Sequence, residues 1–265
     1  MVQPVPLLPT YPVSFPDPRT ALDEPEGLLA AGGALTPEWI IEAYALGIFP
    51  WFERDDEPIF WWCPAERGVI EPGKMRVTRS LAKRLRNSGC SITFDQRFSD
   101  VISACADARA QSVGTWITPR MHEAYCELHR SGLAHSVEVW QDGDLVGGLY
   151  GLSLGQMFFG ESMFSTIRDG SKMAFYHLNQ HLLDWDFTLI DCQMMNPHLA
   201  SLGVRPMHRE AFLKRLADND LSKTRLGSWS TFGSTFGSKF GSSDDSASQR
   251  TTNDPVKPRT EESCA

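Results

Sequence analysis

Apolar side chains recur at every second, or every third to fourth, position through most of the chain, which indicates alternating strands and helices. Helical spacing predicts helices at residues 79–87, 98–110, 119–132, 171–185, 197–202 and 208–216. Period-two spacing predicts strands near 69–70 and at 91–94, 136–140, 145–151, 155–159 and 187–193. Asp142-Gly143 predicts a tight hairpin turn between two of these strands. The mixture predicts an α+β domain over residues 64–216.

The first 63 residues follow a different pattern, and we interpret them as a small N-terminal domain. Residues 1–28 are rich in proline, which favours extended and turn segments over regular elements. Thr36 as N-cap and Pro37 at the first helical position then begin a short amphipathic helix. Two aromatic clusters follow around an acidic loop, and Trp51 beside this loop is a candidate surface for stacking a ligand.

Composition changes again after Ala217. The tetrapeptides Ser-Thr-Phe-Gly, Ser-Thr-Phe-Gly and Ser-Lys-Phe-Gly repeat from 230 to 241, and a polar, serine-rich end follows. Such a segment has too few aliphatic side chains to build a core. We therefore expect residues 217–265 to be a disordered tail.

Overall composition and charge limit the classes of function. The 265-residue chain is 42% hydrophobic, and no apolar run approaches the roughly 20 residues that a membrane helix needs. The N-terminus lacks the features of a signal peptide, so we expect a cytoplasmic protein without a membrane partner. Nothing in the sequence indicates more than a monomer. The six cysteines form no Cys-x-x-Cys pair, which favours reduced thiols. His177 and His181 lack a third ligand, so we expect no metal site.

A basic segment stands out against the net charge of −8. Residues 74–86 contain lysines and arginines and no acidic residue. If a helix begins near Thr78, Arg79, Lys83 and Arg86 lie on one face, where they could contact phosphates. The alternative is a solvated helix face without a function.

Two short stretches carry candidate chemistry. In the first, a predicted strand leads into Gly160 and Glu161, and a carboxylate among apolar residues needs a partner or a function. The alternative is a solvated carboxylate at a strand end. In the second, alternation would place Asp191 and Gln193 on one face of a strand, where they could orient an amine or accept its proton, unless Asp191 only closes a loop. Cys192 would then face the core.

Several motifs together resemble the leucyl/phenylalanyl-tRNA–protein transferases. The resemblance runs in order from about Phe15 to Leu216 and rests on these stretches: Ile48-Phe-Pro-Trp-Phe52, Trp61-Trp62, Gly114-Thr-Trp-Ile-Thr118, His135-Ser-Val-Glu-Val-Trp140, Leu145-Val-Gly-Gly-Leu-Tyr-Gly151, Phe159-Gly-Glu-Ser-Met-Phe-Ser165, Ser171-Lys172 and Leu189-Ile-Asp-Cys-Gln193. It implies an enzyme that moves leucine or phenylalanine, with methionine a further candidate, from aminoacyl-tRNA to the N-terminal Arg or Lys of a protein, creating a bacterial N-end-rule degradation signal. The implied fold is a small N-terminal domain followed by a GCN5-related acetyltransferase-like domain, with no cofactor.

The resemblance also implies roles for individual residues. Asp191 would accept or orient the proton of the attacking amine with the help of Gln193, while Glu161 would position the acceptor. Trp51 and Trp116 would stack on the terminal adenosine of the tRNA, with Tyr44 nearby, and the basic face of helix 79–87 would contact the acceptor stem. The pocket for the aminoacyl group would be formed by Leu149, Gly160, Ser162, Met163, Leu178, Leu182 and Ile190.

Two other functions are compatible with parts of the sequence. A coenzyme A-dependent acetyltransferase shares the implied fold, but the nearest glycine-containing strings, at 86–91 and 111–116, do not match the loop that such enzymes use for pyrophosphate. A non-catalytic module that binds tRNA or basic N-termini would not need Asp191, Gln193 and Glu161.

Overall fold

The computed structural model describes residues 4–110 and 115–230, which fall within one compact unit, Met1–Ser234. Its N-terminal part contains a small sheet in the order β1-β2-β4-β3 and one α-helix, α1 (Pro37–Ala45). The strands are β1 (Leu7–Leu8), β2 (Leu28–Gly32), β3 (Phe49–Pro50) and β4 (Phe60–Trp62). The proline-rich start thus includes β1 and a short 3-10 helix, η1 (Pro18–Thr20), which the sequence pattern did not predict.

A seven-stranded sheet in the order β11-β5-β10-β9-β8-β7-β6 forms the larger part. Its strands are β5 (Glu66–Ile70), β6 (Ser91–Phe94), β7 (Ala134–Gln141), β8 (Asp144–Leu154), β9 (Met157–Ser165), β10 (Leu189–Asp191) and β11 (Arg205–His208). Neighbouring strands are antiparallel except β9 and β10, which are parallel. The predicted α+β class is confirmed.

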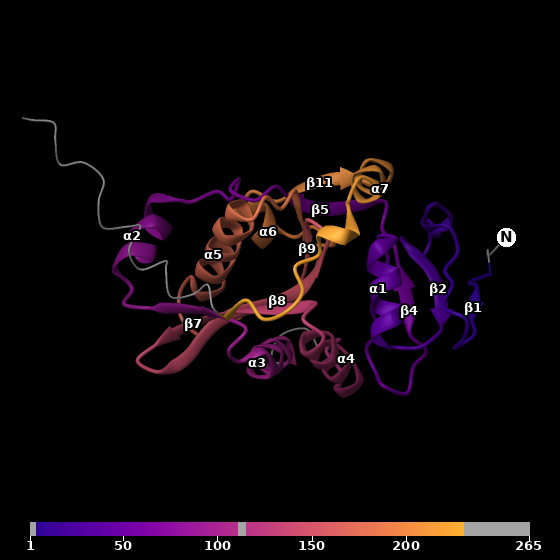
Figure 1. Cartoon of the computed structure of the whole chain (residues 1–265), viewed down its shortest axis with the longest axis horizontal. Coiled ribbons are helices and arrows are strands. Elements are labelled where there is room, and N and C mark those ends of the chain that lie inside the picture. Colours follow the sequence, from indigo (N-terminus) through magenta and orange to yellow (C-terminus); the bar gives the residue numbers. More distant parts are fainter. Residues whose placement is uncertain (1–3, 111–114, 231–265) are drawn as a thin grey trace, which may run out of the picture. The chain divides into compact units, whose positions relative to one another are not determined.

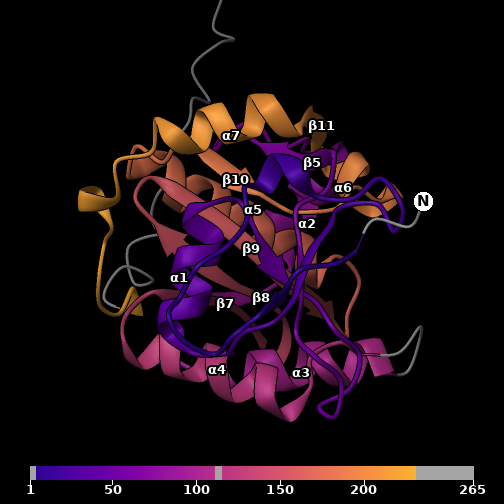
Figure 2. The same ribbon diagram turned by 90° about the vertical axis from the view of Figure 1, so that its right-hand side faces the viewer.

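Helices cover both faces of this sheet. They are α2 (Arg79–Asn87), α3 (Phe98–Ala110), α4 (Pro119–Arg130), α5 (Gly170–Asp184), α6 (Pro197–Leu202) and α7 (Arg209–Ala217). Side chains alternate along β8, so that Tyr150 packs with α3 and α4 whereas Leu149 packs with α5. Figures 1 and 2 accordingly show α3 and α4 together on one side of β7 and β8, and Figure 1 shows α5 on the other side.

Capping residues fix where several helices begin. The hydroxyl oxygens of Thr78 and Thr118 accept hydrogen bonds from backbone N–H groups of α2 and α4, at 3.2 and 3.3 Å. The side-chain oxygen of Asn196 caps α6 in the same way, at 2.8 Å. These local signals explain why the predicted bounds of α2 and α6 and the predicted start of α4 agree with the structure.

Strand β9 differs from the prediction, which ended it at Phe159. It continues to Ser165 through a β-bulge, because Tyr150 pairs with Ser162 whereas the next residue of β8, Gly151, pairs with Gly160. Glu161 is therefore the extra residue between two pairs, and a bulge redirects the side chain that it inserts. Gly151 permits this close pairing, since a Cβ there would lie 2.2 Å from the carbonyl oxygen of Phe159.

The expectation that the chain beyond Ala217 has no structure is wrong for residues 218–230. This segment contains a 3-10 helix, η2 (Leu221–Lys223), and, near its end, Trp229, which is only 2% exposed. The remainder of the predicted tail, 231–265, lies outside the described residues. Within the described part of the chain, no helix has the length and apolar character needed to cross a membrane.

Candidate active site

One cavity of about 740 Å³ lies between the N-terminal part and the large sheet. The N-terminal part contributes residues of β3 and the acidic loop after it. The rest of the wall comes from β8, β9, α5, β10 with the segment after it, the end of α3, the segment before α4, and α6. Its lining residues include Phe49, Trp51, Glu53, Arg109, Trp116, Leu149, Phe158, Gly160, Glu161, Ser162, Met163, Phe175, Leu178, Ile190, Cys192, Gln193, Met194 and Leu199. The cavity therefore combines an apolar pocket, two tryptophans and one polar centre.

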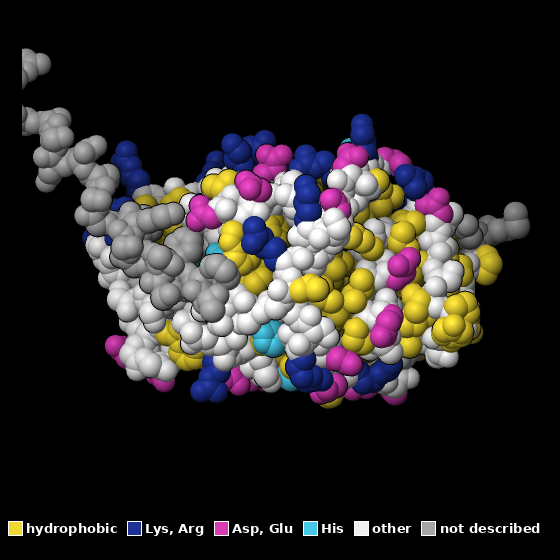
Figure 3. All heavy atoms as spheres, viewed as in Figure 1, with side chains coloured by type: hydrophobic (Ala, Val, Ile, Leu, Met, Phe, Trp, Pro, Cys, Tyr) yellow, Lys and Arg dark blue, Asp and Glu magenta, His cyan; other side chains and the backbone are white. Residues whose placement is uncertain are grey.

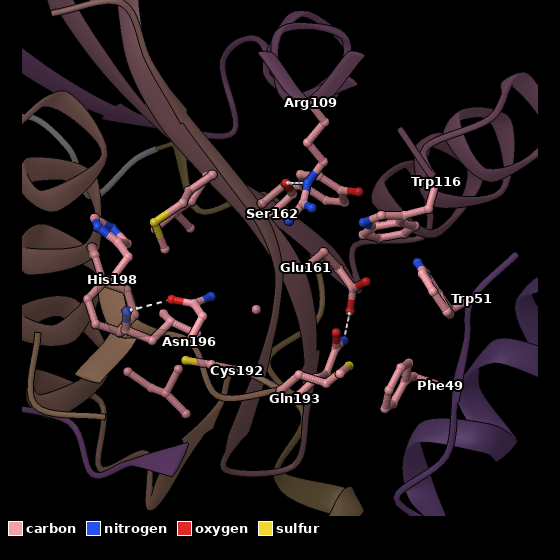
Figure 4. Close-up of a pocket in the computed structure, with 18 of the residues that line it drawn as sticks. Phe49, Trp51, Arg109, Trp116, Glu161, Ser162, Cys192, Gln193, Asn196 and His198 are labelled. Carbon is pink, nitrogen blue, oxygen red and sulfur yellow. Dashed lines mark hydrogen bonds between the residues drawn. The ribbon is translucent and has the colours of Figure 1, made fainter. Parts of the chain in front are cut away.

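Glu161 is the centre of the polar group. Its Oε1 accepts hydrogen bonds from the Tyr44 hydroxyl at 2.6 Å and from Nε2 of Gln193 at 2.8 Å. The Tyr44 and Tyr125 hydroxyl oxygens lie 2.7 Å apart, which extends the network to α4. Figure 4 shows the Glu161 and Gln193 side chains pointing toward each other across the cavity. The bulge in β9 thus joins three distant segments at one carboxylate.

The surroundings of Glu161 raise its pKa to about 7. Burial is the largest cause, because only 7% of the residue is exposed and desolvation disfavours the charged carboxylate. Hydrogen bonds from Tyr44, Tyr125 and Gln193 act in the opposite direction, and the charge of Asp191 adds to the increase. A carboxylate with this pKa can take up or release a proton near neutral pH.

Asp191 has different surroundings from those the sequence suggested. It is fully buried, and both of its carboxylate oxygens accept hydrogen bonds from the Arg67 guanidinium. Oδ1 also accepts from the backbone N–H of Gln193, at 2.8 Å. Asp191 is not among the residues that line the cavity. Its hydrogen bond to Gln193 holds the segment after β10 in place.

Asp191 and Gln193 do not share a strand face as alternation predicted. Strand β10 ends at Asp191, and Gln193 has a φ of 59°, in the left-handed region. This turn brings the Gln193 amide to Glu161. Cys192 lines the cavity and also packs against the core, as predicted. Burial raises the pKa of the Cys192 thiol, which makes it a poor nucleophile.

The apolar pocket contains most of the residues that the resemblance assigned to it. Leu149, Met163, Leu178 and Ile190 line the cavity, as do Gly160 and Ser162 beside them. Leu182 is fully buried and packs within the core, away from the lining. Sequence reasoning missed Phe158, Phe175 and Leu199, which complete the pocket; the strand and helix patterns marked the first two only as core residues.

Trp51 and Trp116 lie near each other at one side of the cavity, beside Glu161 (Figure 4). Trp51 is 38% exposed, which is unusual for so large an apolar side chain and leaves its ring available to a ligand. Arg109, which sequence reasoning also missed, donates to the Ser162 hydroxyl at 3.0 Å, and its guanidinium carbon lies 5.8 Å from the centre of the Trp116 ring. Its position at the end of α3 gave no signal by itself.

The predicted basic face exists on α2, where Arg79, Lys83 and Arg86 are all exposed. Figure 1 shows α2 at the opposite end of the compact unit from α1, and Figure 3 shows Lys and Arg side chains along the upper edge that leads to it. These residues do not line the cavity. Among the described residues, no cluster of His, Cys, Asp and Glu is suited to hold a metal ion.

Comparison with known sequences decides the family. The family described as leucyl/phenylalanyl-tRNA protein transferase matches residues 69–217, and the N-terminal domain of the same family matches residues 33–65. The chain belongs to the leucyl/phenylalanyl-tRNA protein transferase family. It is thus an aminoacyltransferase, which replaces both alternatives that the sequence left open.

Individual relatives agree with this assignment. A leucyl/phenylalanyl-tRNA–protein transferase of Chromohalobacter salexigens is 58% identical over 212 residues, which cover 80% of this chain and 82% of that protein. A protein of the same name from Chromobacterium violaceum is 54% identical over 215 residues, covering 81% and 91% of the two chains.

Two solved structures show a distant similarity. The structure of L-PGS from Bacillus licheniformis has a TM-score of 0.39 at 10% identity, over 61% of this chain and 52% of that one. A GCN5-related N-acetyltransferase from Kribbella flavida has a TM-score of 0.37 at 12% identity, over 65% and 61%. The assignment therefore rests on the sequence relatives.

Proposed function

We propose that the cavity binds the aminoacylated 3′ end of a tRNA together with the N-terminal Arg or Lys of an acceptor protein, and joins leucine or phenylalanine to that terminus. The observation that supports this most is the presence of three features in one cavity. These are an apolar pocket, two tryptophans at its side and the Glu161–Gln193 pair. An aminoacyl-adenosine and an amine require such surroundings side by side.

The donor would occupy the apolar pocket and the tryptophans. Stacking between Trp51 and Trp116 would hold the terminal adenine, since aromatic side chains bind unpaired bases by their faces. Leu149, Met163 and Leu178 would surround the leucine or phenylalanine side chain. The flexible thioether of Met163 can adapt to both the leucine and the phenylalanine side chain. An aminoacyl group that is branched at Cβ, such as valine, would contact the pocket wall near the entrance.

The acceptor's α-amine would lie beside Glu161. The amine nitrogen attacks the ester carbonyl, a C–N bond forms, and the C–O bond to the tRNA ribose breaks. Glu161 takes the proton that the neutral amine nitrogen loses and gives it to the ribose oxygen as that oxygen leaves. Because the ester is already activated, holding the two reactants together would provide much of the rate. Glu161 takes the proton-accepting role first given to Asp191, and Gln193 orients the carboxylate.

The wider roles follow from this reaction. An added leucine or phenylalanine would create a degradation signal of the bacterial N-end rule, which requires a cytoplasmic enzyme. Nothing in the reaction needs a second copy of the chain, so a monomer suffices. The exposed face of α2 would contact the acceptor stem without reading its sequence.

A transfer assay tests the proposal. Radiolabelled leucine, phenylalanine and valine would be offered as aminoacyl-tRNA to otherwise identical peptides that begin with Arg, Lys or Ala. We expect transfer of leucine and phenylalanine to Arg and Lys peptides, and transfer of valine at least about tenfold slower. Glu161→Gln should lower kcat by about 100-fold. Equal transfer to the Ala peptide, or equal use of valine, would contradict the proposal.

The choice of control follows from the structure. Glu123→Gln alters an exposed carboxylate of α4 whose partner is the surface residue Arg130, so it should leave transfer unchanged. Asp191→Ala is unsuitable, because it would leave the buried Arg67 charge without its partner and destabilise the fold.

A further inference from the structure

The segment 218–230 follows directly after the part of the chain that the family model matches, which ends at residue 217. We call it the C-terminal strap. Figure 1 shows it, in yellow, running from below α7 along the large sheet. The strap is held by hydrogen bonds at both ends and is therefore a fixed part of the fold.

At its first end, the strap binds the turn between β8 and β9. The Asn219 side chain accepts from the backbone N–H of Gln156 at 2.8 Å and donates to the carbonyl oxygen of Leu154 at 2.9 Å. The Thr224 hydroxyl accepts from the N–H of Gly155, at 2.8 Å. These bonds replace the backbone pairing that the turn cannot make by itself.

At its other end, the strap inserts Trp229 into an aromatic cluster. The indole lies parallel to the His135 ring, with centroids 3.7 Å apart, and meets Trp185 edge to face at 5.2 Å. The backbone N–H of Trp229 donates to a carboxylate oxygen of Asp95, at 2.7 Å. Only 2% of Trp229 is exposed, so the indole fills a site inside the core.

This cluster lies directly behind the apolar pocket. The Phe158 ring lines the cavity and also lies 6.0 Å from Trp229, which itself does not line the cavity. Trp229 also contacts His181, 5.5 Å away and three residues after the pocket residue Leu178 on α5. On another side, the Phe158 ring lies against Gly151, where a Cβ would be 2.6 Å from the ring. The Phe158 ring is therefore enclosed, with Trp229 as one of its supports.

We propose that Trp229 is a positioning residue that sets the depth of the aminoacyl side-chain pocket by supporting Phe158 and α5 from behind. The strap would thus determine the preference between leucine and phenylalanine, although none of its residues touches either substrate. This inference rests on the proposed function of the pocket. Without the indole, the Phe158 ring can move back into the vacated space, and the deeper pocket should favour the larger phenylalanine side chain.

The test compares donors that differ only in the aminoacyl group. Leucyl- and phenylalanyl-adenosine serve as minimal donors with one Arg-starting peptide, using the full-length chain. We expect Trp229→Ala to raise the ratio of kcat/KM for phenylalanine over leucine about fivefold, mainly through the KM values. Trp229→Phe, which keeps an aromatic ring, should stay within about twofold of the wild-type ratio.

Further variants separate specificity from stability and from the pocket assignment itself. Leu128→Ala opens a cavity in the other core cluster and should lower stability without changing the ratio. If Trp229→Ala does not fold, Trp229→Leu retains more of the volume and should still shift the ratio. Leu178→Phe narrows the pocket directly and should lower the ratio.

The outcomes distinguish two failures. If Leu178→Phe changes the ratio but the Trp229 variants leave it at the wild-type value, the role of Trp229 is wrong and the pocket assignment stands. If Leu178→Phe leaves the ratio unchanged, the pocket assignment is wrong and the inference falls with it. A Leu128→Ala ratio that shifts as far as that of Trp229→Ala would show a general effect of destabilisation and would also overturn the inference.

Discussion

Glu161 shows how far the surroundings of one side chain can change its chemistry. A glutamate in water is fully ionised at neutral pH. Burial raises the pKa of this one, against the opposing effect of the hydrogen bonds from Tyr44 and Gln193, and leaves it divided between its two forms near pH 7. A proton acceptor works best when its pKa is close to the working pH. The bulge in β9 therefore places a residue of suitable acidity where the acceptor amine would lie.

The raised pKa of Glu161 predicts a pH-dependent stability. Because the folded pKa of about 7 exceeds the ordinary value of 4.5, the folded state retains a proton that the unfolded state loses, and stability falls as pH rises between these values. We expect wild type to lose about 2 kcal/mol relative to Glu161→Gln between pH 5.5 and pH 8. Urea denaturation of both proteins at the two pH values measures this difference. Parallel pH dependences would refute it.

Sequence reasoning singled out Glu161 but assigned proton transfer to Asp191. The reason is that Asp191 is separated from Arg67 by 124 positions, and the spacing of residues in β10 cannot reveal a partner so distant. Arg67 gave no signal either, because it follows another charged residue, Glu66, and lies outside the strand predicted near 69–70. A charge fully buried in a strand requires an opposite charge nearby, but the sequence offered several acidic residues for that role.

Among the helices and strands, capping residues in the sequence predicted where helices begin, because helix starts are determined by local interactions. The hydroxyl cap of Thr78 and the threonine-proline start of α4 placed those helices correctly. The bulge in β9 and the left-handed turn at Gln193 were missed, because both are determined by pairing with other strands. These two irregular points are the ones that bring the polar side chains together.

Helix α2 leads to a prediction about tRNA binding. Reversing two charges of its exposed face, Lys83→Glu with Arg86→Glu, should raise KM for aminoacyl-tRNA about tenfold or more at low salt. The difference from wild type should shrink as salt is added, since charge contacts with phosphates are screened. Transfer from an aminoacyl-adenosine should be unchanged, because α2 does not line the cavity.

A control with the same net charge makes this test specific. Arg130→Glu with Lys214→Glu reverses two exposed cations on α4 and α7. This double variant should keep KM for tRNA within about twofold of wild type. An equal rise in both double variants would indicate an effect of total charge, and an equal loss with both donors would place the α2 residues in the cavity's chemistry.

In the whole molecule, Arg67 connects parts that are far apart in the sequence. Its guanidinium pairs with Asp191 of β10 and donates to the carbonyl oxygen of Gly47, which follows α1, at 2.6 Å. Its guanidinium carbon also lies 5.0 Å from the Phe49 ring centre and 4.5 Å from that of Phe212 in α7. The N-terminal part, the large sheet and α7 therefore meet around one cation.

This arrangement predicts a large loss of stability from one substitution and its recovery by another. Arg67→Met should lower the free energy of unfolding by about 3–5 kcal/mol, since it leaves the Asp191 carboxylate buried without a partner. Adding Asp191→Leu to this variant should restore most of the loss. Chemical denaturation measures both, with the surface change Arg130→Met as control, and a double variant no more stable than the single one would contradict the explanation.

The C-terminal strap shows that amino-acid composition alone does not predict whether a segment of the molecule is ordered. Its polar sequence suggested a tail, and for most of its residues the judgement of low core content is correct. A few residues attach the segment: Asn219 and Thr224 bind the β8–β9 turn, and the Trp229 indole packs into an aromatic site built by residues 135, 158 and 185. Composition averages over a window and cannot register a single anchoring residue.

The Arg67–Asp191 pair also limits how such a chain can change over generations. Replacing either residue alone leaves a buried charge, so a lineage that exchanges the pair for apolar residues must first pass through a destabilised form. Most natural proteins have too little stability in reserve to survive that step. The two positions are thus expected to be inherited together, along with the turn at residue 193, whose backbone N–H donates to Asp191.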